Sequence, residues 1–176
     1  MTARPRALVV HESWFGNTAR LAAAVADGLR SDGYVVEVCH VDRAPTVATI
    51  DVDLLVVGAP THAFSLSRPS TRVEAVRQGG DASGSGGGVR EWLEAGRGSA
   101  RAVPTVCFDT RADRARHLPG SAARKAARLA RDAGLEPSRV TESFYVADVA
   151  GPLLPGELSR AARWGRRLAP QPTGSR

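Results

Sequence analysis

A loop rich in hydroxyl and amide groups follows the first apolar run of the chain, residues 7–10, and precedes an alanine-rich segment. This first loop, residues 13–18, reads Ser-Trp-Phe-Gly-Asn-Thr and contains no lysine or arginine. Unpaired backbone N–H groups at the start of a helix, together with the helix dipole, favour an anion. Ser13 and Thr18 add hydroxyl donors, and Gly16 permits close approach of the backbone. The first loop therefore predicts a site for a phosphomonoester that is held by hydrogen bonds rather than by opposite charge.

Two other phosphate-binding patterns do not match this loop. The nucleoside-triphosphate loop needs a lysine followed by serine or threonine, whereas this loop ends Gly16-Asn17-Thr18. The dinucleotide fingerprint needs three spaced glycines, and this loop contains one. Asp42 follows the second apolar run, where an acid could bind a ribose, but a single carboxylate is weak support for NAD.

Five apolar runs alternate with alanine- and arginine-rich segments of helical period, which predicts repeated strand and helix units. The predicted strands cover residues 6–11, 34–41, 53–58, 102–108 and 140–146. The predicted helices cover residues 17–30, about 70–78, 89–95, and two segments opened by residues 119–121 and 155–157 that end near 134 and 168. The first, third and fourth strands are the most continuously apolar and are expected at the centre of the sheet. The pattern predicts an α/β fold with a doubly wound five-stranded parallel sheet, whose ligand site lies at the carboxyl ends of the strands.

Length and composition indicate one domain. The chain has 176 residues, of which 43% are hydrophobic, and no window approaches the roughly 20 apolar residues of a membrane-spanning helix. We expect the domain to cover residues 1–169, a disordered tail to cover 170–176, and the glycine-rich segment 79–88 to form a surface loop. Cys39 and Cys107 lie in apolar runs without metal-ligand spacing, which indicates buried reduced thiols and a cytoplasmic protein.

The chain is strongly basic, with a formal net charge of +6 and a pI near 10.5. Such a charge can indicate a nucleic-acid-binding protein, because clustered cations release counterions from phosphate backbones. Here the arginines are spread along the chain at helical spacing next to alanines, as in residues 122–131. Aromatic residues make up only 5% of the chain, which leaves little for base stacking. We therefore predict solvated helix faces and no nucleic-acid partner.

The first loop and its flanks resemble those of the flavodoxin family. Two aliphatic residues precede the loop, hydroxyl groups and a glycine lie within it, and an alanine follows on the helix; the matching residues are Val9, Val10, Ser13, Gly16, Thr18, Ala22 and Val25. His11 stands where the family usually has phenylalanine or tyrosine. The resemblance covers nearly the whole chain and implies the strand order 2-1-3-4-5 and an FMN cofactor. Its phosphate contacts would then be Ser13, Trp14, Phe15, Gly16, Asn17 and Thr18.

The resemblance also implies flavin contacts in the loops after the third and fourth strands. After the third strand, the candidates are Pro60, Thr61, His62, Ala63 and Phe64, of which His62 and Phe64 would touch the ring. After the fourth strand, Asp109, Thr110 and Arg111 would contact the pyrimidine end. The family usually has an aromatic residue that stacks on the flavin ring in the loop after the fourth strand. That residue is missing here, and Arg111 is a candidate to stack on the ring instead.

Three functions are compatible with these residues. The first is an FMN-dependent electron carrier, whose partner would be acidic because this chain is basic, unlike the generally acidic carriers of the family. The second is an NAD(P)H-dependent FMN quinone reductase, in which the missing lid leaves room for a small-molecule acceptor. The third is a binding module of the same fold without a cofactor. The sequence shows no nucleophile and base pair and no metal cluster, so any catalysis would be that of the flavin.

Overall fold

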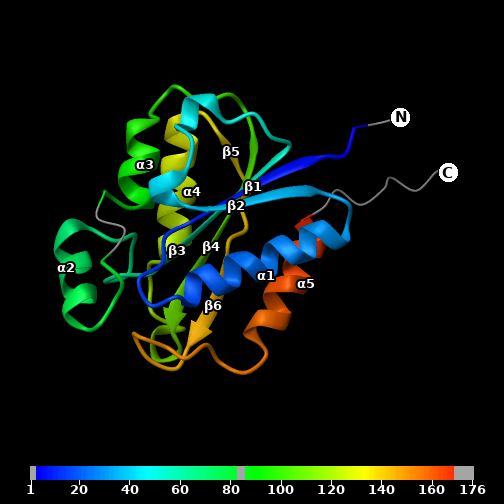
Figure 1. Ribbon diagram of the computed structural model, residues 1–176. Coiled ribbons are helices and arrows are strands. Elements are labelled where there is room, and N and C mark those ends of the chain that lie inside the picture. The colour runs from blue at the N-terminus through cyan, green and yellow to red at the C-terminus, as the bar shows by residue number, and fades with distance from the viewer. Residues whose placement is uncertain (1–2, 83–85, 169–176) are drawn as a thin grey trace.

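A computed structural model describes residues 3–82 and 86–168, in which strands and helices alternate along the chain (Figure 1). The elements are β1 (Arg6–His11), α1 (Asn17–Ser31), β2 (Val35–His40), β3 (Leu54–Pro60), α2 (Pro69–Arg77), α3 (Val89–Ala95), β4 (Pro104–Ala112), α4 (Ala122–Ala133), β5 (Glu136–Pro137), β6 (Glu142–Val146) and α5 (Glu157–Leu168). The predicted helices all form, with ends that shift by a few residues at most.

The strands form one parallel sheet in the order β2-β1-β3-β4-β5, with β6 also paired to β4. This confirms the predicted doubly wound α/β fold and its strand order. β1, β3 and β4 lie at the centre, and Val9, Val10 and Val57 are fully buried there. Their continuous apolar character follows from burial on both faces of the sheet.

Helices cover both faces of the sheet (Figure 1). α1 and α5 pack on one face, where Leu21, Val25 and Trp164 join the core. α3 and α4 pack on the other face, where Leu93 and Ala126 join a second apolar cluster. α2 stands apart from both layers, beside the ends of the strands (Figure 1).

α1 and α5 approach each other closely through two glycines. A Cβ atom on Gly28 would lie 2.1 Å from the carbonyl oxygen of Ala162, and one on Gly165 would lie 2.3 Å from the carbonyl oxygen of Val25. Neither distance is compatible with a real side chain, since the opposing atoms belong to backbone. The two helices therefore pack backbone against backbone at this point.

The fourth strand is longer than predicted. We expected it to end at residue 108, with a loop from Asp109 onward, but β4 continues through Asp109, Thr110 and Arg111 to Ala112. These polar residues pair with β3 and β6 in the ladder and are all buried. Polar side chains are typical of a solvated loop, whereas here each of the three makes a hydrogen bond inside the fold, although Asp109 Oδ1 and Arg111 Nε have no partner in the described part of the chain.

The fifth position of the sheet is divided between two short strands. β6 pairs with the second half of β4, whereas the unpredicted β5 covers only two residues and pairs with Pro104 and Thr105. Residues 138–141 interrupt the position, and Val140 within them is 73% exposed. A two-residue strand has no periodicity that a sequence pattern can reveal.

The predicted tail lies outside the described residues, as does the middle of the glycine-rich segment. The described parts of that segment contact the rest of the protein: the Asp81 backbone N–H donates to the Trp14 carbonyl at 2.7 Å, and Gly80 lies against the same carbonyl. Of the two free thiols, Cys107 is buried and Cys39 half-buried, and burial raises the pKa of Cys107 to about 12. No helix in the described part of the chain is long and apolar enough to span a bilayer.

Candidate functional site

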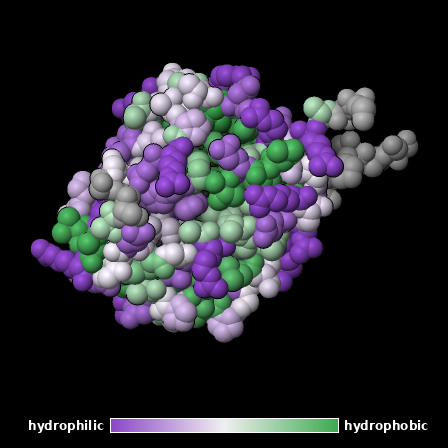
Figure 2. All heavy atoms as spheres, in the orientation of Figure 1, coloured by the Kyte–Doolittle hydropathy of each residue, from purple (hydrophilic) through white to green (hydrophobic). Residues whose placement is uncertain are grey.

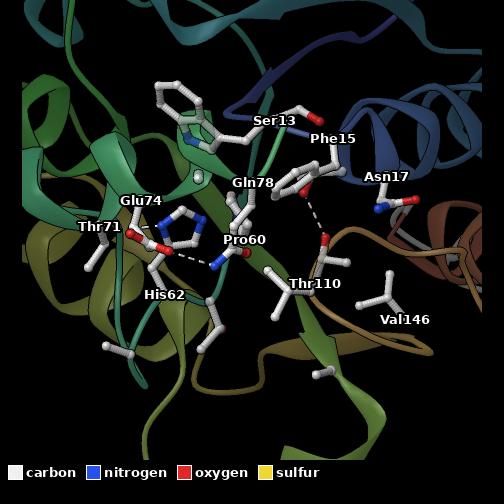
Figure 3. Close-up of a pocket in the computed structure, with 17 residues that line it drawn as sticks. Ser13, Phe15, Asn17, Pro60, His62, Thr71, Glu74, Gln78, Thr110 and Val146 are labelled. Carbon is white, nitrogen blue, oxygen red and sulfur yellow. Dashed lines mark hydrogen bonds between the residues drawn. The ribbon is translucent and has the colours of Figure 1, made fainter. Parts of the chain in front are cut away.

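A cavity of about 310 Å³ opens where the first loop, the ends of β3, β4 and β6, and α2 meet (Figure 3). Its volume is in the range of small-molecule sites. Most of the predicted site residues line it, namely Ser13, Trp14, Phe15, Asn17, Thr18, Pro60, Thr61, His62, Ala63 and Thr110. Gly16, Phe64, Asp109 and Arg111 are not part of the lining.

The first loop presents unpaired backbone amides at the start of α1. Gly16, with φ of 83°, turns the chain into the helix and accepts from the N–H of Arg20 at 3.1 Å. The Ser13 hydroxyl oxygen accepts from Ala19 at 3.2 Å, which leaves its own proton free to donate. Among the described residues, no acceptor binds the backbone N–H groups of residues 14–18. These unpaired amides lie where the sequence predicted a site for an anion.

The hydroxyl groups of Thr18 and Thr110 bind each other across this site. Their oxygen atoms are 2.7 Å apart, and the two side chains are 2% and 5% exposed (Figure 3). One of the two hydroxyls donates and the other accepts, so one O–H proton of the pair has no acceptor in the described part of the protein. The pair joins the start of α1 to the end of β4.

Valine at either position is expected to destabilise the protein, because the remaining threonine hydroxyl is then buried without its partner. We expect Thr18→Val and Thr110→Val each to lower the free energy of unfolding by about 1–3 kcal/mol, and the double variant to lose much less than the sum. Urea denaturation of the four proteins measures this cycle. Additive losses would contradict a direct hydrogen bond between the two hydroxyls.

The segment after β3 forms a tight hairpin turn. The N–H of His62 donates to the carbonyl of Ser65 at 2.8 Å, and the N–H of Ser65 donates back at 3.1 Å. Between them, Ala63 and Phe64 have φ of 46° and 66°. Left-handed backbone at two consecutive residues is the geometry of a type I′ turn, which usually requires glycine or asparagine, so this turn stores backbone strain. The Phe64 side chain is 53% exposed and lies in neither the core nor the cavity lining.

His62 is the ionisable ring of the cavity. Its Nδ1 lies 3.2 Å from the Thr71 hydroxyl oxygen, and its other ring nitrogen faces the cavity (Figure 3). Burial lowers the pKa of His62, while Glu12 raises it in part and Arg72 lowers it further. The ring is therefore neutral at pH 7 and offers the cavity a nitrogen that either donates or accepts a hydrogen bond, depending on the tautomer.

Asp109 contacts the start of α4 rather than the cavity. Its Oδ2 accepts from the N–H of Ala123 at 3.1 Å, and the side chain is fully buried. Thr61 and Ser121 bind the neighbouring amides of the same helix end. Asp109 thus occupies the favourable end of the α4 dipole, a structural position that its place in the sequence does not indicate.

Arg111 is also absent from the cavity lining. Its Nη2 donates to the carbonyls of Ala115 and Leu118, at 2.7 and 3.0 Å. The residue is 8% exposed. The guanidinium therefore holds the turn after β4, and this arrangement does not support the predicted stacking of Arg111 on a flavin ring.

Comparison with solved structures identifies this architecture. An archaeal flavodoxin superposes with a TM-score of 0.64 at 18% identity, covering 93% of this chain and 96% of that one. The chain has the flavodoxin fold. Flavodoxin 2 from Bacillus cereus is similar, with a TM-score of 0.62 and 14% identity over 91% and 94% of the two chains. A flavodiiron protein from Giardia intestinalis matches 93% of this chain over 35% of its own length, with a TM-score of 0.58 and 19% identity. No protein-family model matches, and comparison with curated proteins finds no significant sequence match.

In this flavodoxin fold, one wall of the cavity comes from α2 and the residue after it, none of which was among the predicted site residues. Thr71, Glu74, Ala75 and Gln78 face the cavity, and Gln78 donates to Glu74 at 2.9 Å (Figure 3). The opposite face of α2 is exposed to solvent, where an apolar patch is visible (Figure 2). The spacing of the four residues over two helical turns is the only sequence signal that they share a face.

The ends of β4 and β6 supply the remaining wall. Ala112, Val146 and Val149 line it, and none was predicted. The loop that carries Val149 is tied to the first loop, because the Asn17 amide nitrogen donates to the carbonyl of Ala150 at 3.1 Å. Asn17 accordingly points toward this loop and away from His62 (Figure 3). The described residues contain no group of three or more His, Cys, Asp and Glu side chains that could hold a metal ion.

His11 is expected to make the stability of this flavodoxin-like protein depend on pH. Burial lowers its pKa from 6.5 to about 4, and His40 adds to the shift. The ring lies 5.5 Å from that of His40, and its Nδ1 is buried with no partner in the described part of the chain. Because the unfolded chain binds this proton near pH 6.5 and the folded chain only near pH 4, acid favours unfolding in that interval.

The free energy of unfolding is therefore expected to fall by about 1 kcal/mol per unit as the pH drops from about 6.5 toward 4. His11→Phe removes the ionisable ring and its unpaired nitrogen, so the variant should be more stable and its stability should vary less over this interval. Urea denaturation at several pH values compares the two proteins. Equal slopes in wild type and variant would show that His11 does not carry the effect.

Proposed function

We propose that this protein binds FMN and exchanges electrons with a redox partner protein. The observation that carries the proposal is the row of unpaired amides in residues 14–18, which opens onto a mainly apolar cavity at the carboxyl ends of the strands. A ligand with a phosphate at one end and a flat, largely apolar ring system at the other matches both parts. The solved flavodoxins of the same fold support this choice.

The residues present fit the cofactor. The backbone amides of the first loop and the Ser13 hydroxyl would hold its phosphate, since the lining contains no lysine or arginine. Phe15, Pro60 and Val146 would contact its apolar parts, and His62 would hydrogen-bond to a polar edge. FMN supplies one-electron or two-electron transfer when it is bound.

The charge of the surface favours an acidic partner. Exposed arginines without an ion pair to any described residue lie on α4 and α5; they are Arg124, Arg128, Arg131, Arg163, Arg166 and Arg167. Complementary charge steers association and fixes orientation more than it raises affinity. We infer that association with the partner weakens as ionic strength rises.

A second candidate function is NAD(P)H-dependent reduction of a quinone, favoured by one specific feature. The aromatic side chains of the cavity wall, Trp14 and Phe15, both come from the first loop, whereas Ala112, Val146 and Val149 supply the opposite side. Small aliphatic residues there leave room for a substrate, and the His62 nitrogen that faces the cavity is placed to hydrogen-bond to an acceptor oxygen.

One titration separates these functions. The purified protein is saturated with FMN, separated from free flavin, and mixed first with NADH or NADPH and then with a quinone, while the visible spectrum is recorded. We expect FMN to bind, and the spectrum to remain unchanged with the nucleotide until a flavoprotein reductase is added. Direct bleaching by the nucleotide, followed by recovery with quinone, would instead establish a reductase. Failure to bind FMN would leave a cofactor-free module of the flavodoxin fold as the explanation.

A further inference from the structure

A buried carboxylate lies directly behind the first loop. Glu12 follows β1, and its side chain is fully buried. Its Oε1 accepts from the indole Nε1–H of Trp14 at 2.8 Å and from the Ser67 hydroxyl. Its Oε2 accepts from the backbone N–H of Val89 at 2.9 Å. Burial of a carboxylate is costly unless its oxygens are hydrogen-bonded, so all these donors are needed where Glu12 lies.

The contacts of Glu12 extend to three other segments of the chain. The Arg72 guanidinium of α2 donates to the Ser67 hydroxyl oxygen at 3.0 Å and pairs with Glu91 of α3 at 2.9 Å. Gly88 leaves space for Glu12, because a Cβ there would lie 2.4 Å from Oε2. The carboxylate thus joins the first loop, the segment after the hairpin, α2 and α3 in one hydrogen-bonded network.

Trp14 is the residue through which this network reaches the cavity. Its indole is held by Glu12, and its carbonyl is held by the N–H of Asp81. The residue is only 7% exposed and lines the cavity, while its own backbone N–H remains among the unpaired amides of the loop. With side chain and carbonyl both fixed, the peptide groups on either side of Trp14 have little freedom to turn.

We propose that Glu12 is a positioning residue: it holds Trp14 and so keeps the amides of the first loop directed at the phosphate of the cofactor. The inference rests on the proposed FMN binding and names the side chain that prepares the site. An anion site whose donors are already oriented loses less conformational entropy when the ligand binds, so its affinity is higher. Hydrogen bonds to a charged acceptor are the strong ones, which suits Glu12 to this role.

The test compares two flavins that differ only in the phosphate. Dissociation constants for FMN and riboflavin are measured by fluorescence quenching for wild type, Glu12→Gln and Trp14→Phe. Glutamine has the shape of glutamate, but its NH₂ group must face either the Val89 N–H or the two donors Trp14 and Ser67. Phenylalanine keeps a ring but lacks the N–H. The preference for FMN is the dissociation constant for riboflavin divided by that for FMN. We expect this ratio to fall about tenfold in both variants. Glu157→Gln is the matched control, since Glu157 is a buried carboxylate that is hydrogen-bonded to Arg160 and to the backbone N–H of Tyr145, away from the loop. This variant should keep the preference for FMN.

A second measurement uses the protein without flavin. It follows the hydrogen exchange of the Trp14 indole N–H with solvent, and the signal of this proton is identified by its loss in Trp14→Phe. We expect slow exchange in wild type and exchange faster by about tenfold or more in Glu12→Gln. Variants that keep the full preference for FMN, or lose affinity for both flavins equally, would overturn the role of Glu12 but leave the proposed FMN binding intact. Wild-type protein that binds neither flavin, or binds both equally, would overturn the proposed phosphate site and this inference with it.

Discussion

Replacing Gly165 with alanine is expected to lower the free energy of unfolding by about 2–3 kcal/mol. In most helix interiors the same change raises stability by up to about 1 kcal/mol, because alanine is the better helix former. Here the new Cβ would lie 2.3 Å from the carbonyl oxygen of Val25, so α5 must move away from α1. The movement would separate the closely packed core that contains Trp164 and Leu21.

Urea denaturation of the flavin-free protein measures this loss. Ser159→Ala provides the control, since Ser159 is exposed on the same helix and the substitution raises helix propensity without a clash. Gly28→Ala, which meets the carbonyl of Ala162 from the other side, should be destabilised in the same way. A stabilised Gly165→Ala protein would mean that the two helices do not approach as closely as described.

The second large effect is expected at Gly16, in the affinity for FMN. Gly16 and Gly33 flank α1 with φ of 83° and 90°, and a Cβ at either would meet no atom within 4 Å. Alanine at either position should therefore cost a similar backbone strain of about 1–2 kcal/mol. Only residue 16, however, sets the direction of the unpaired amides in the first loop.

We expect Gly16→Ala to weaken FMN binding by about tenfold or more, and Gly33→Ala to leave it unchanged. Flavin fluorescence titration gives the dissociation constants, and thermal unfolding verifies that the two variants lose similar stability. Equal FMN affinities in the two variants would show that the loop tolerates a different turn at residue 16, and that its amides are not the phosphate site.

The sequence predicted the sheet and the first loop because both depend on local patterns. The apolar runs of β1, β3 and β4 have the length and continuity of strands buried on both faces, which determined the centre of the sheet. Once that order is known, the loop after β1 must lie at the carboxyl edge, where the cavity is found. Most of the predicted contacts in this loop and after β3 line the cavity for this reason.

The features that were missed depend on tertiary contacts. Asp109 and Arg111 resemble loop residues in the sequence, but inside the fold Asp109 accepts a hydrogen bond from the amide of Ala123 and Arg111 donates to carbonyls after β4. Glu12 gives no pattern at all, since a lone glutamate is normally expected at the surface. The contribution of α2 to the cavity depends on where this helix lies, which its weakly apolar sequence does not indicate.

The division of the last sheet position between β5 and β6 has a consequence for self-association. An uninterrupted edge strand offers a continuous row of free N–H and C=O groups on which the strand of another molecule can grow. Here β5 supplies only two residues of such a row, and β6 supplies five more after the interruption at residues 138–141. Intermolecular pairing along this edge would gain few hydrogen bonds before reaching the interruption. The break thus limits strand addition at this edge of the sheet, whereas β2 at the opposite edge is an uninterrupted strand of six residues.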